Sequence, residues 1–269
     1  MSLSSWSTEV ANFVAHMGAA GLSRGTIQIR VYHLTRIAAE LGGSPATLSV
    51  ERLTAWLHGQ RWEPNTRRAY RGTLRAFYSW AVAMGHVPLS PAHQLPSVRI
   101  PRGRPRPVPE DGFRLAMRVA DRRARLGIML AGICGLRRGE VAAARREDLE
   151  RDLLGWSLRV KGKGGHVRLV PVPDSLASEI LSRPEGWLFP STHGGHLTPH
   201  HLGKIVSRNL PEGHTMHSLR HRCGTAMLEA SGGNLRVVQE ILGHANLNTT
   251  AIYTKVADRA MRDAVEAVA

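Results

Sequence analysis

The chain has 269 residues, of which 42% are hydrophobic, so it can bury one large core or two modest ones and does not read as disordered. Basic residues outnumber acidic ones by 36 to 21, a formal charge of +15, and all but four of the 36 are arginine. A GC-rich genome would explain part of the arginine excess. Such a charge on a folded chain also indicates a polyanionic partner, with nucleic acid as the first candidate.

The two cysteines and the absence of a long apolar segment narrow the class of protein further. Cys134 and Cys223 belong to no Cys-x-x-Cys pair, which excludes a disulfide scaffold and cysteine-based zinc ribbons. No basic segment followed by an apolar one marks a signal peptide at the start. The longest apolar run, 126–136, is too short to span a bilayer. We expect a cytoplasmic protein without membrane contact.

Four helices are predicted in the first part of the chain, because apolar residues recur there at helical spacing between capping residues. They are expected at 6–17, from a cap at Ser23 to Leu41, at 50–58, and from Pro64 to just before Gly85. The fourth carries a basic stripe on the face opposite its apolar residues: Arg67, Arg68, Arg71 and Arg75. A charge run is usually a solvated face, but no acid balances this one. Solvation and contact with a DNA backbone therefore both stay open.

Residues 98–109 form the clearest break in the sequence. The segment holds four prolines, no acid and four arginines, namely Arg99, Arg102, Arg104 and Arg106. Proline fixes φ and removes a donor, so we expect an extended, semi-rigid connector. It is either a solvated linker or a strap along a phosphate backbone. The predicted organisation is a helical domain at 1–97, this linker at 98–109 and a second domain at 110–269.

The second domain is predicted to be mostly helical with one small sheet. Residues 156–160 and 166–170 alternate with period two around Gly162-Lys163-Gly164-Gly165, which indicates a β-hairpin with a glycine-rich turn. Helical spacing is found at 110–120, 124–133, 175–181, 199–207, 217–230, 235–242 and 258–267. The expected fold class is mainly α with a small β-sheet.

Arg137 is the first candidate for chemistry, after Gly135-Leu136 at the end of an apolar helix. An arginine there can be a simple helix cap. Glu140, three residues on, can instead hold the guanidinium from one helical turn away. An arginine so braced presents a rigid fork to a phosphate.

His217, Arg220 and His221 share one helix face, at positions i, i+3 and i+4. Zinc is one interpretation, but the fixed cation of Arg220 disfavours a bound dication, and no acid accompanies the histidines. Another group of histidines lies among glycines and a proline and is interpreted as loop surface: His193, His196, His200 and His201. No metal and no cofactor are expected.

Tyr253 lies nine residues after His244, the last residue of the Leu242-Gly243-His244 motif. A tyrosine near a C-terminus is usually a packing residue without a chemical role. With a reference pKa of about 10 it is a poor nucleophile unless nearby cations stabilise the phenolate. The arginines, lysine and histidines of the other motifs would supply these cations.

The order of these motifs resembles the catalytic signature of the tyrosine recombinase (phage integrase) family. The chain has Gly-Leu-Arg137-x-x-Glu140, Gly-Lys163-Gly, His217-x-x-Arg220-His221, Leu-Gly-His244 and then Tyr253. Residues 22–26 and 65–78 look like the family's helical core-binding domain, so the resemblance covers nearly the whole chain. It implies a SAM-like core-binding domain before a mixed α/β catalytic domain. Cys134 departs from the threonine that many members have there, at a packing position that should not affect the chemistry.

The resemblance also implies a reaction. Tyr253 would attack a DNA phosphodiester, leaving a 3′-phosphotyrosine and a free 5′-hydroxyl that can later reverse the step. Arg137 and Arg220 would clamp the non-bridging oxygens as charge builds in the transition state, so no Mg²⁺ is needed. Glu140 would support Arg137.

Further roles follow from the resemblance. Lys163 would protonate the departing 5′-oxygen, and Lys161 is the competing candidate for that acid. His217 would be a general acid/base, His244 would hydrogen-bond the phosphate, and His221 would be structural.

The implied partners are double-stranded DNA at core-type sites and further copies of the chain, as a tetramer on synapsed DNA. The first helix begins within ten residues of the start, so no arm-binding domain is expected. The terminal helix would dock onto a neighbouring protomer, with packing onto its own chain as the alternative. The setting would be a bacterial or phage-host cell, at the nucleoid, and the natural reaction integration or excision of a phage or mobile element. An accessory directionality factor stays open.

Two rival functions share these residues. A type IB topoisomerase would keep the chemistry and relax supercoiled DNA lacking a target site, whereas recombination needs paired sites. A non-catalytic DNA-binding protein could keep the fold, although all five catalytic motifs are present.

Overall fold

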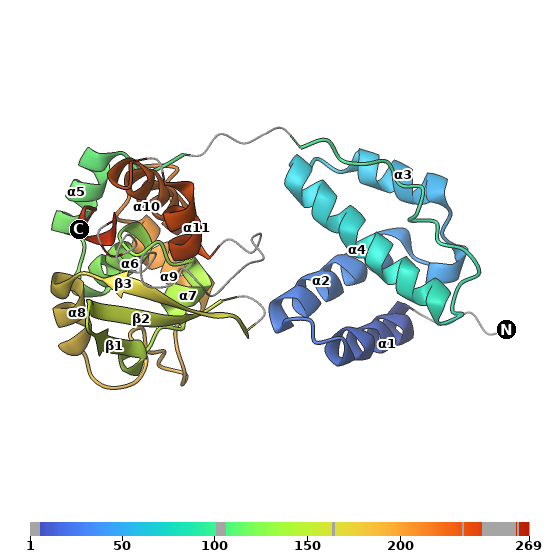
Figure 1. Cartoon of the computed structure of the whole chain (residues 1–269). Coiled ribbons are helices and arrows are strands. Elements are labelled where there is room, and N and C mark those ends of the chain that lie inside the picture. The colour runs from blue at the N-terminus through green and yellow to red at the C-terminus, as the bar shows by residue number, and fades with distance from the viewer. Residues whose placement is uncertain are drawn as a thin grey trace. The chain divides into compact units, whose positions relative to one another are not determined.

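The computed structural model describes residues 6–100, 106–162, 165–232, 234–243, 262 and 264–268. The chain divides into two compact units, Met1–Gly103 and Arg104–Ala269, each with its own apolar core (Figure 1). The division falls within the proline- and arginine-rich segment 98–109. No helix in the described ranges has both the length and the apolarity needed to cross a membrane.

The first unit contains the four helices that the sequence predicts. They are α1 (Trp6–Ala19), α2 (Arg24–Leu41), α3 (Val50–Gly59) and α4 (Pro64–Ala83), with a short 3₁₀ turn at Pro45–Thr47. Ser23 and Ser49 cap α2 and α3, since each side chain accepts a backbone N–H three residues later. The helical prediction for this part of the chain is confirmed, with small shifts at the helix ends.

The core of the first unit gathers around α4. Leu74 and Phe77 of this helix are fully buried and lie among Phe13, Leu34 and Leu53 of the other three helices. The Phe13 and Phe77 rings meet edge to face at 5.5 Å, a favoured arrangement for aromatic rings. The opposite side of α4 therefore faces solvent.

The second unit packs helices around a three-stranded sheet. Its elements are α5 (Glu110–Val119), α6 (Arg122–Gly132), α7 (Arg138–Ala142), a 3₁₀ turn (Arg146–Asp148), β1 (Leu149–Asp152), β2 (Gly155–Lys161), β3 (Val167–Val172), α8 (Asp174–Leu181), α9 (Pro199–Ser207), α10 (Met216–Ala230) and α11 (Leu235–Leu242). The sequence did not indicate α7 or β1, because five and four residues are too few to establish a period. The helix expected at 258–267 lies mostly outside the described residues.

The sheet is antiparallel with the order β1-β2-β3, and the predicted hairpin between β2 and β3 is confirmed (Figure 1). Lys161 pairs with Val167, and the N–H of Gly162 donates to the carbonyl oxygen of His166 at 2.7 Å. Helix α8 contacts β2, and α11 contacts β3. The hairpin turn and α11 are thus both anchored to the same sheet.

Helix α6 is the centre of the second unit. Its residues from Leu126 to Ala131 are buried except for the half-buried Met129, and α9 and α10 pack against it. A Cβ at Gly127 would lie 2.7 Å from Val206, and one at Gly132 would lie 2.7 Å from Phe113, so both glycines permit close helix packing. The chain leaving α6 lies between α10 and α11, since a Cβ at Gly135 would meet Cys223 and Leu242.

Candidate active site

A sharp turn after α6 places Arg137 beside α10 and α11. Gly135 in this turn has a φ of +66°, and a Cβ there would lie 2.5 Å from Leu242 Cδ2, so only glycine fits. Its carbonyl oxygen accepts a hydrogen bond from Arg220 Nη1 at 2.5 Å. The turn thus connects the two arginines that the sequence motifs single out.

Glu140 braces Arg137 in the contact that their spacing suggests. Arg137 Nη1 donates to Glu140 Oε1 at 2.9 Å, and the Arg137 backbone N–H donates to Oε2 at 2.8 Å. Arg168 of β3 adds a two-pronged contact to both carboxylate oxygens, at 3.0 and 2.8 Å. Burial alone would raise the pKa of Glu140, but the hydrogen bonds from Arg168 and Arg137 outweigh it and hold the pKa below its ordinary value. The carboxylate therefore stays ionised.

Arg220 is a buried cation held by neutral carbonyl oxygens. Its side chain donates to Gly135 and, at 2.6 Å, to the carbonyl oxygen of Leu242. Burial, and next the positive charge of Arg137, lower its pKa to about 10, so it remains charged at neutral pH. A desolvated cation beside a second cation favours the binding of an anion between them.

His217 and His221 lie one helical turn apart on α10 and contact each other. Their Nε2 atoms are 2.9 Å apart, so the ring that carries the Nε2 proton donates a hydrogen bond to the other. Burial first, and then the charges of His221 and Arg220, lower the pKa of His217 below its ordinary value. A neutral His217 can accept a proton near pH 7.

Arg137, His217 and Arg220 line a pocket of about 740 Å³ between α7, α9 and α10. Its cationic and histidine side chains are Arg137, Arg138, His200, Lys204, His217 and Arg220. No Asp or Glu is found among its described lining residues. A cleft lined by one sign of charge concentrates ligands of the opposite sign, which suits a nucleic-acid strand.

Three of the predicted catalytic residues, Lys163, His244 and Tyr253, lie outside the described residues. Their described neighbours lie beside the Arg137–Glu140 pair, and a Cβ at Gly162 would lie 3.8 Å from Glu140 Oε1. Gly162, directly before Lys163, closes the end of the hairpin. Gly243, directly before His244, accepts a hydrogen bond from Arg137 Nη2 at 2.8 Å. Lys161, the competing acid, is exposed at the end of β2.

The pocket and its surroundings contain polar residues that the sequence interpretation missed. Arg138 follows Arg137 directly, so its place beside a candidate residue could have been noticed in the sequence. His200 and Lys204 share a face of α9 at positions i and i+4, and this spacing is also visible in the sequence. Arg168 gave no signal, because an arginine in an alternating strand is ordinarily an outward-facing polar residue.

The basic stripe on α4 divides into two kinds of arginine. Arg71 donates through Nε and Nη2 to the carbonyl oxygen of Leu95, at 3.1 and 2.8 Å, and Arg67 donates to the carbonyl oxygen of Gln60 at 2.8 Å. These two hold the chain segments on either side of α4. Arg68 is exposed and Arg75 is half-buried.

The four linker arginines are only partly described. Arg99 and Arg106 are exposed, and Arg102 and Arg104 lie outside the described residues.

The parts of the chain that the structure describes contain neither a group of metal ligands nor an accessible thiol. No group of three or more His, Cys, Asp or Glu side chains there is placed to hold a metal ion. Cys134 and Cys223 are free, and complete burial raises the pKa of both thiols.

The described end of the chain packs onto its own second unit, the alternative arrangement considered for the terminal helix. Ala264 and Val265 are buried in the core of this unit, and Arg262 donates to the carbonyl oxygen of Trp156 at 2.8 Å.

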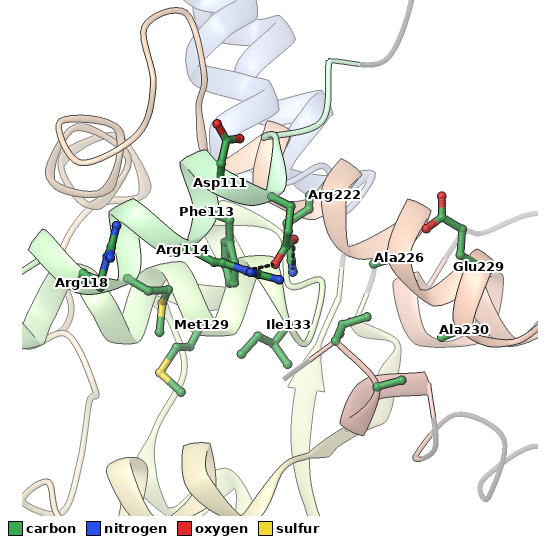
Figure 2. Close-up of a pocket in the computed structure, with 14 residues that line it drawn as sticks. Asp111, Phe113, Arg114, Arg118, Met129, Ile133, Arg222, Ala226, Glu229 and Ala230 are labelled. Atoms are coloured by element: carbon green, nitrogen blue, oxygen red, sulfur yellow. Dashed lines mark hydrogen bonds and ion pairs between the residues drawn. The ribbon is translucent and has the colours of Figure 1, made fainter.

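Ala267 and Val268 form part of a second pocket, of about 1250 Å³, between α5, α6 and α10. Figure 2 shows Arg222 beside Phe113 at this pocket, with the guanidinium carbon 3.7 Å from the ring centre.

Residues 110–260 match the model of the phage integrase family. The tyrosine recombinase XerA of Pyrococcus horikoshii is 30% identical over 94% of this chain and 91% of its own length. A solved integrase from mycobacterium phage Brujita is also 30% identical, with a TM-score of 0.54, covering 97% of this chain and 92% of the other. A lambda integrase tetramer bound to a Holliday junction is similar in fold, with a TM-score of 0.71 at 17% identity, over 93% and 81% of the two chains.

The chain belongs to the phage integrase family of tyrosine recombinases, enzymes that break and rejoin DNA strands. The resemblance inferred from the motifs is therefore confirmed, as is the fold of mainly helical units with a small sheet.

Proposed function

We propose that this chain cleaves and rejoins DNA at core-type sites through a 3′-phosphotyrosine on Tyr253, and that it integrates or excises a phage or mobile element. The observation that carries the chemistry is the pocket in which Arg137 and Arg220 stand side by side, with no acid among the described lining residues. The 30% identity to a mycobacteriophage integrase supports the biological role.

In the proposed reaction the Tyr253 oxygen forms a bond to phosphorus, and the bond from phosphorus to the 5′-oxygen breaks. His217, which its lowered pKa keeps neutral near pH 7, takes the phenol proton, and Lys163 gives a proton to the departing 5′-oxygen. Arg137 and Arg220 stabilise the charge on the non-bridging oxygens. His244 donates a hydrogen bond to the phosphate. Attack by a 5′-hydroxyl of the partner strand reverses these steps.

We assign the first unit, together with the predicted linker 98–109, to gripping the duplex. Arg68 and Arg75 are free of the backbone contacts that hold Arg67 and Arg71, so they are the better candidates in the α4 stripe. Exposed Arg99 and Arg106 would contact phosphates from the linker. In a tetramer on synapsed DNA, the C-terminal segment would leave its own unit and dock on a neighbour. This assembly would act at the nucleoid of a bacterial or phage-host cell.

The chemistry is tested by covalent trapping. A library of nicked duplexes with random sequence around the nick is incubated with the protein, and adducts that survive SDS are isolated and sequenced. Wild-type protein should give an adduct without added metal and in EDTA, and Tyr253→Phe should give none. The matched control is Tyr32→Phe, which removes an exposed hydroxyl from the first unit and should trap DNA normally. An undiminished adduct in Tyr253→Phe would refute the assignment of the nucleophile.

The outcome of the reaction is tested separately. Two copies of the recovered site on one plasmid should recombine, whereas relaxation of a supercoiled plasmid without any site would favour a type IB topoisomerase. Mapping adducts on the source genome distinguishes the biological roles. Adducts at the ends of a mobile element support the proposal, and adducts at a single chromosomal site support resolution of chromosome dimers instead.

A further inference from the structure

Three consecutive carbonyl oxygens at the C-terminal end of α11 accept hydrogen bonds from three different arginines. The pairs are Arg168 Nε to Ile241 at 3.1 Å, Arg220 Nη2 to Leu242 at 2.6 Å, and Arg137 Nη2 to Gly243 at 2.8 Å. The last carbonyls of a helix lack partners within the helix and carry its negative dipole end, so cations suit them. Two of these arginines, Arg137 and Arg220, form the proposed phosphate clamp. The third, Arg168, does not belong to it.

Arg168 connects Glu140, which holds Arg137, to the C-terminal end of α11. Its guanidinium meets both oxygens of Glu140, which in turn holds Arg137, and its Nε holds the end of α11. The side chain is 16% exposed, and Arg168 is not among the described residues that line the 740 Å³ pocket. Its hydrogen bonds therefore reach the clamp through Glu140 and α11.

Gly243 shows how tightly the end of α11 lies against Arg168. An added Cβ at this residue would lie 3.0 Å from Arg168 Cδ, 3.1 Å from Nε and 3.2 Å from Cζ. The backbone at Gly243 also has a φ of +61°. The chain thus passes directly over the guanidinium at the residue before His244.

We propose that Arg168 is a positioning residue for DNA cleavage: its guanidinium sets the Glu140–Arg137 arm of the phosphate clamp and the end of α11 in one fixed geometry. This inference rests on the proposed function. Lysine cannot replace it, because a single ammonium cannot match both carboxylate oxygens and a carbonyl in one plane. Misplacement of a clamp group by about 1 Å can cost roughly 10²-fold in rate.

The charges facing Glu140 give a second readout. Arg137, Arg168 and Arg220 face this carboxylate from three elements, and the hydrogen bonds from Arg168 are the largest of the effects that offset its burial. Without Arg168, burial should prevail and raise the pKa of Glu140. In the proposed mechanism protonation of His217 sets the acid limb of the cleavage rate, and protonation of Glu140 at a higher pH than in the wild type should make that limb steeper.

The test measures single-turnover adduct formation on the nicked duplex recovered by trapping. Arg168→Gln and Arg168→Lys should each lower the maximal rate about 10²-fold, with unchanged non-covalent affinity for that duplex and a steeper acid limb. Arg168→Gln should add little to the loss in Glu140→Gln, because both remove the same link. The matched control is Arg159→Gln, which removes an arginine–carboxylate pair with Glu150 on the same sheet and should leave the rate unchanged.

A normal rate and pH profile in folded Arg168→Gln, or full rescue by Arg168→Lys, would overturn the inference. If Arg168→Gln does not fold, Gly243→Ala displaces the Arg168 side chain without removing it. An unaltered maximal rate in that variant would likewise overturn the inference. Failure of the wild-type protein to form any adduct would instead refute the proposed function.

Discussion

Arg220 Nη1 donates a hydrogen bond of 2.5 Å to the carbonyl oxygen of Gly135, 85 residues earlier in the chain. The contact joins α10 to the turn that carries Arg137, so the geometry of one proposed catalytic arginine depends on the turn that presents the other. The turn itself exists because a glycine occupies position 135.

Gly135→Ala should therefore damage both stability and activity. The new methyl group would meet Leu242 Cδ2 at 2.5 Å on a backbone of positive φ, and such strain costs on the order of 1–3 kcal/mol. Denaturant unfolding should show this loss, together with slower adduct formation. Gly139→Ala is the control for stability, because nothing lies within 4 Å of its Cβ position. Equal stability of the two variants would contradict the steric argument.

Removal of either clamp arginine should slow cleavage severely. Arg137→Ala and Arg220→Ala each remove a preorganised donor to the reacting phosphate, which commonly costs about 10²–10³-fold in rate. Single-turnover adduct formation measures the loss. Arg123→Ala, an exposed arginine on α6, should react at the wild-type rate. A loss below tenfold in both clamp variants would mean that the pocket is not the site of phosphoryl transfer.

Arg138 and Lys204 should contribute to DNA affinity and little to the chemical step. Both line the pocket without belonging to the clamp, so each would contact a phosphate of the bound strand. Arg138→Gln and Lys204→Gln should weaken binding and lower the slope of log affinity against log salt by about 1 each. Arg208→Gln, at the exposed end of α9 outside the pocket lining, is the control. An unchanged slope would show that neither cation meets a phosphate.

The contact between the two histidines of α10 predicts a pH effect. His221 is one of the charges that lower the pKa of His217, so His221→Gln should raise that pKa toward 6.5. In the proposed mechanism cleavage needs neutral His217 as the proton acceptor, so the acid limb of the cleavage rate should move to higher pH. His214→Gln, whose ring contacts carbonyl oxygens of its own loop, should leave the profile in place. A shift to lower pH would exclude His217 as the base.

The α4 stripe should separate into DNA-binding and structural arginines. Arg68→Gln should weaken DNA binding at unchanged stability, since the side chain is exposed. Arg71→Gln should lower the unfolding free energy by about 1–3 kcal/mol, because it releases the carbonyl oxygen of Leu95 from a charged donor. Thermal unfolding and a DNA titration together separate the effects, and the opposite pattern would reverse the two assignments.

Much of this protein was predictable from local sequence signals. Apolar spacing and capping residues such as Ser23 and Ser49 predicted the helices, because helix formation depends on residues three and four apart. The hairpin followed from alternation around glycines. The Arg137–Glu140 contact was predictable since both residues lie within one turn. The order of motifs predicted the family.

The tertiary structure decided which protein groups each arginine contacts. Arg168 and Arg71 are indistinguishable in sequence from solvated arginines, yet one holds Glu140 and the other holds Leu95. The sequence placed charge on a strand or a helix face, and long-range packing determined its partner. A guanidinium contacts whatever carbonyl or carboxylate the fold brings within about 3 Å. That proximity arises from segments far apart in the chain and has no local signature.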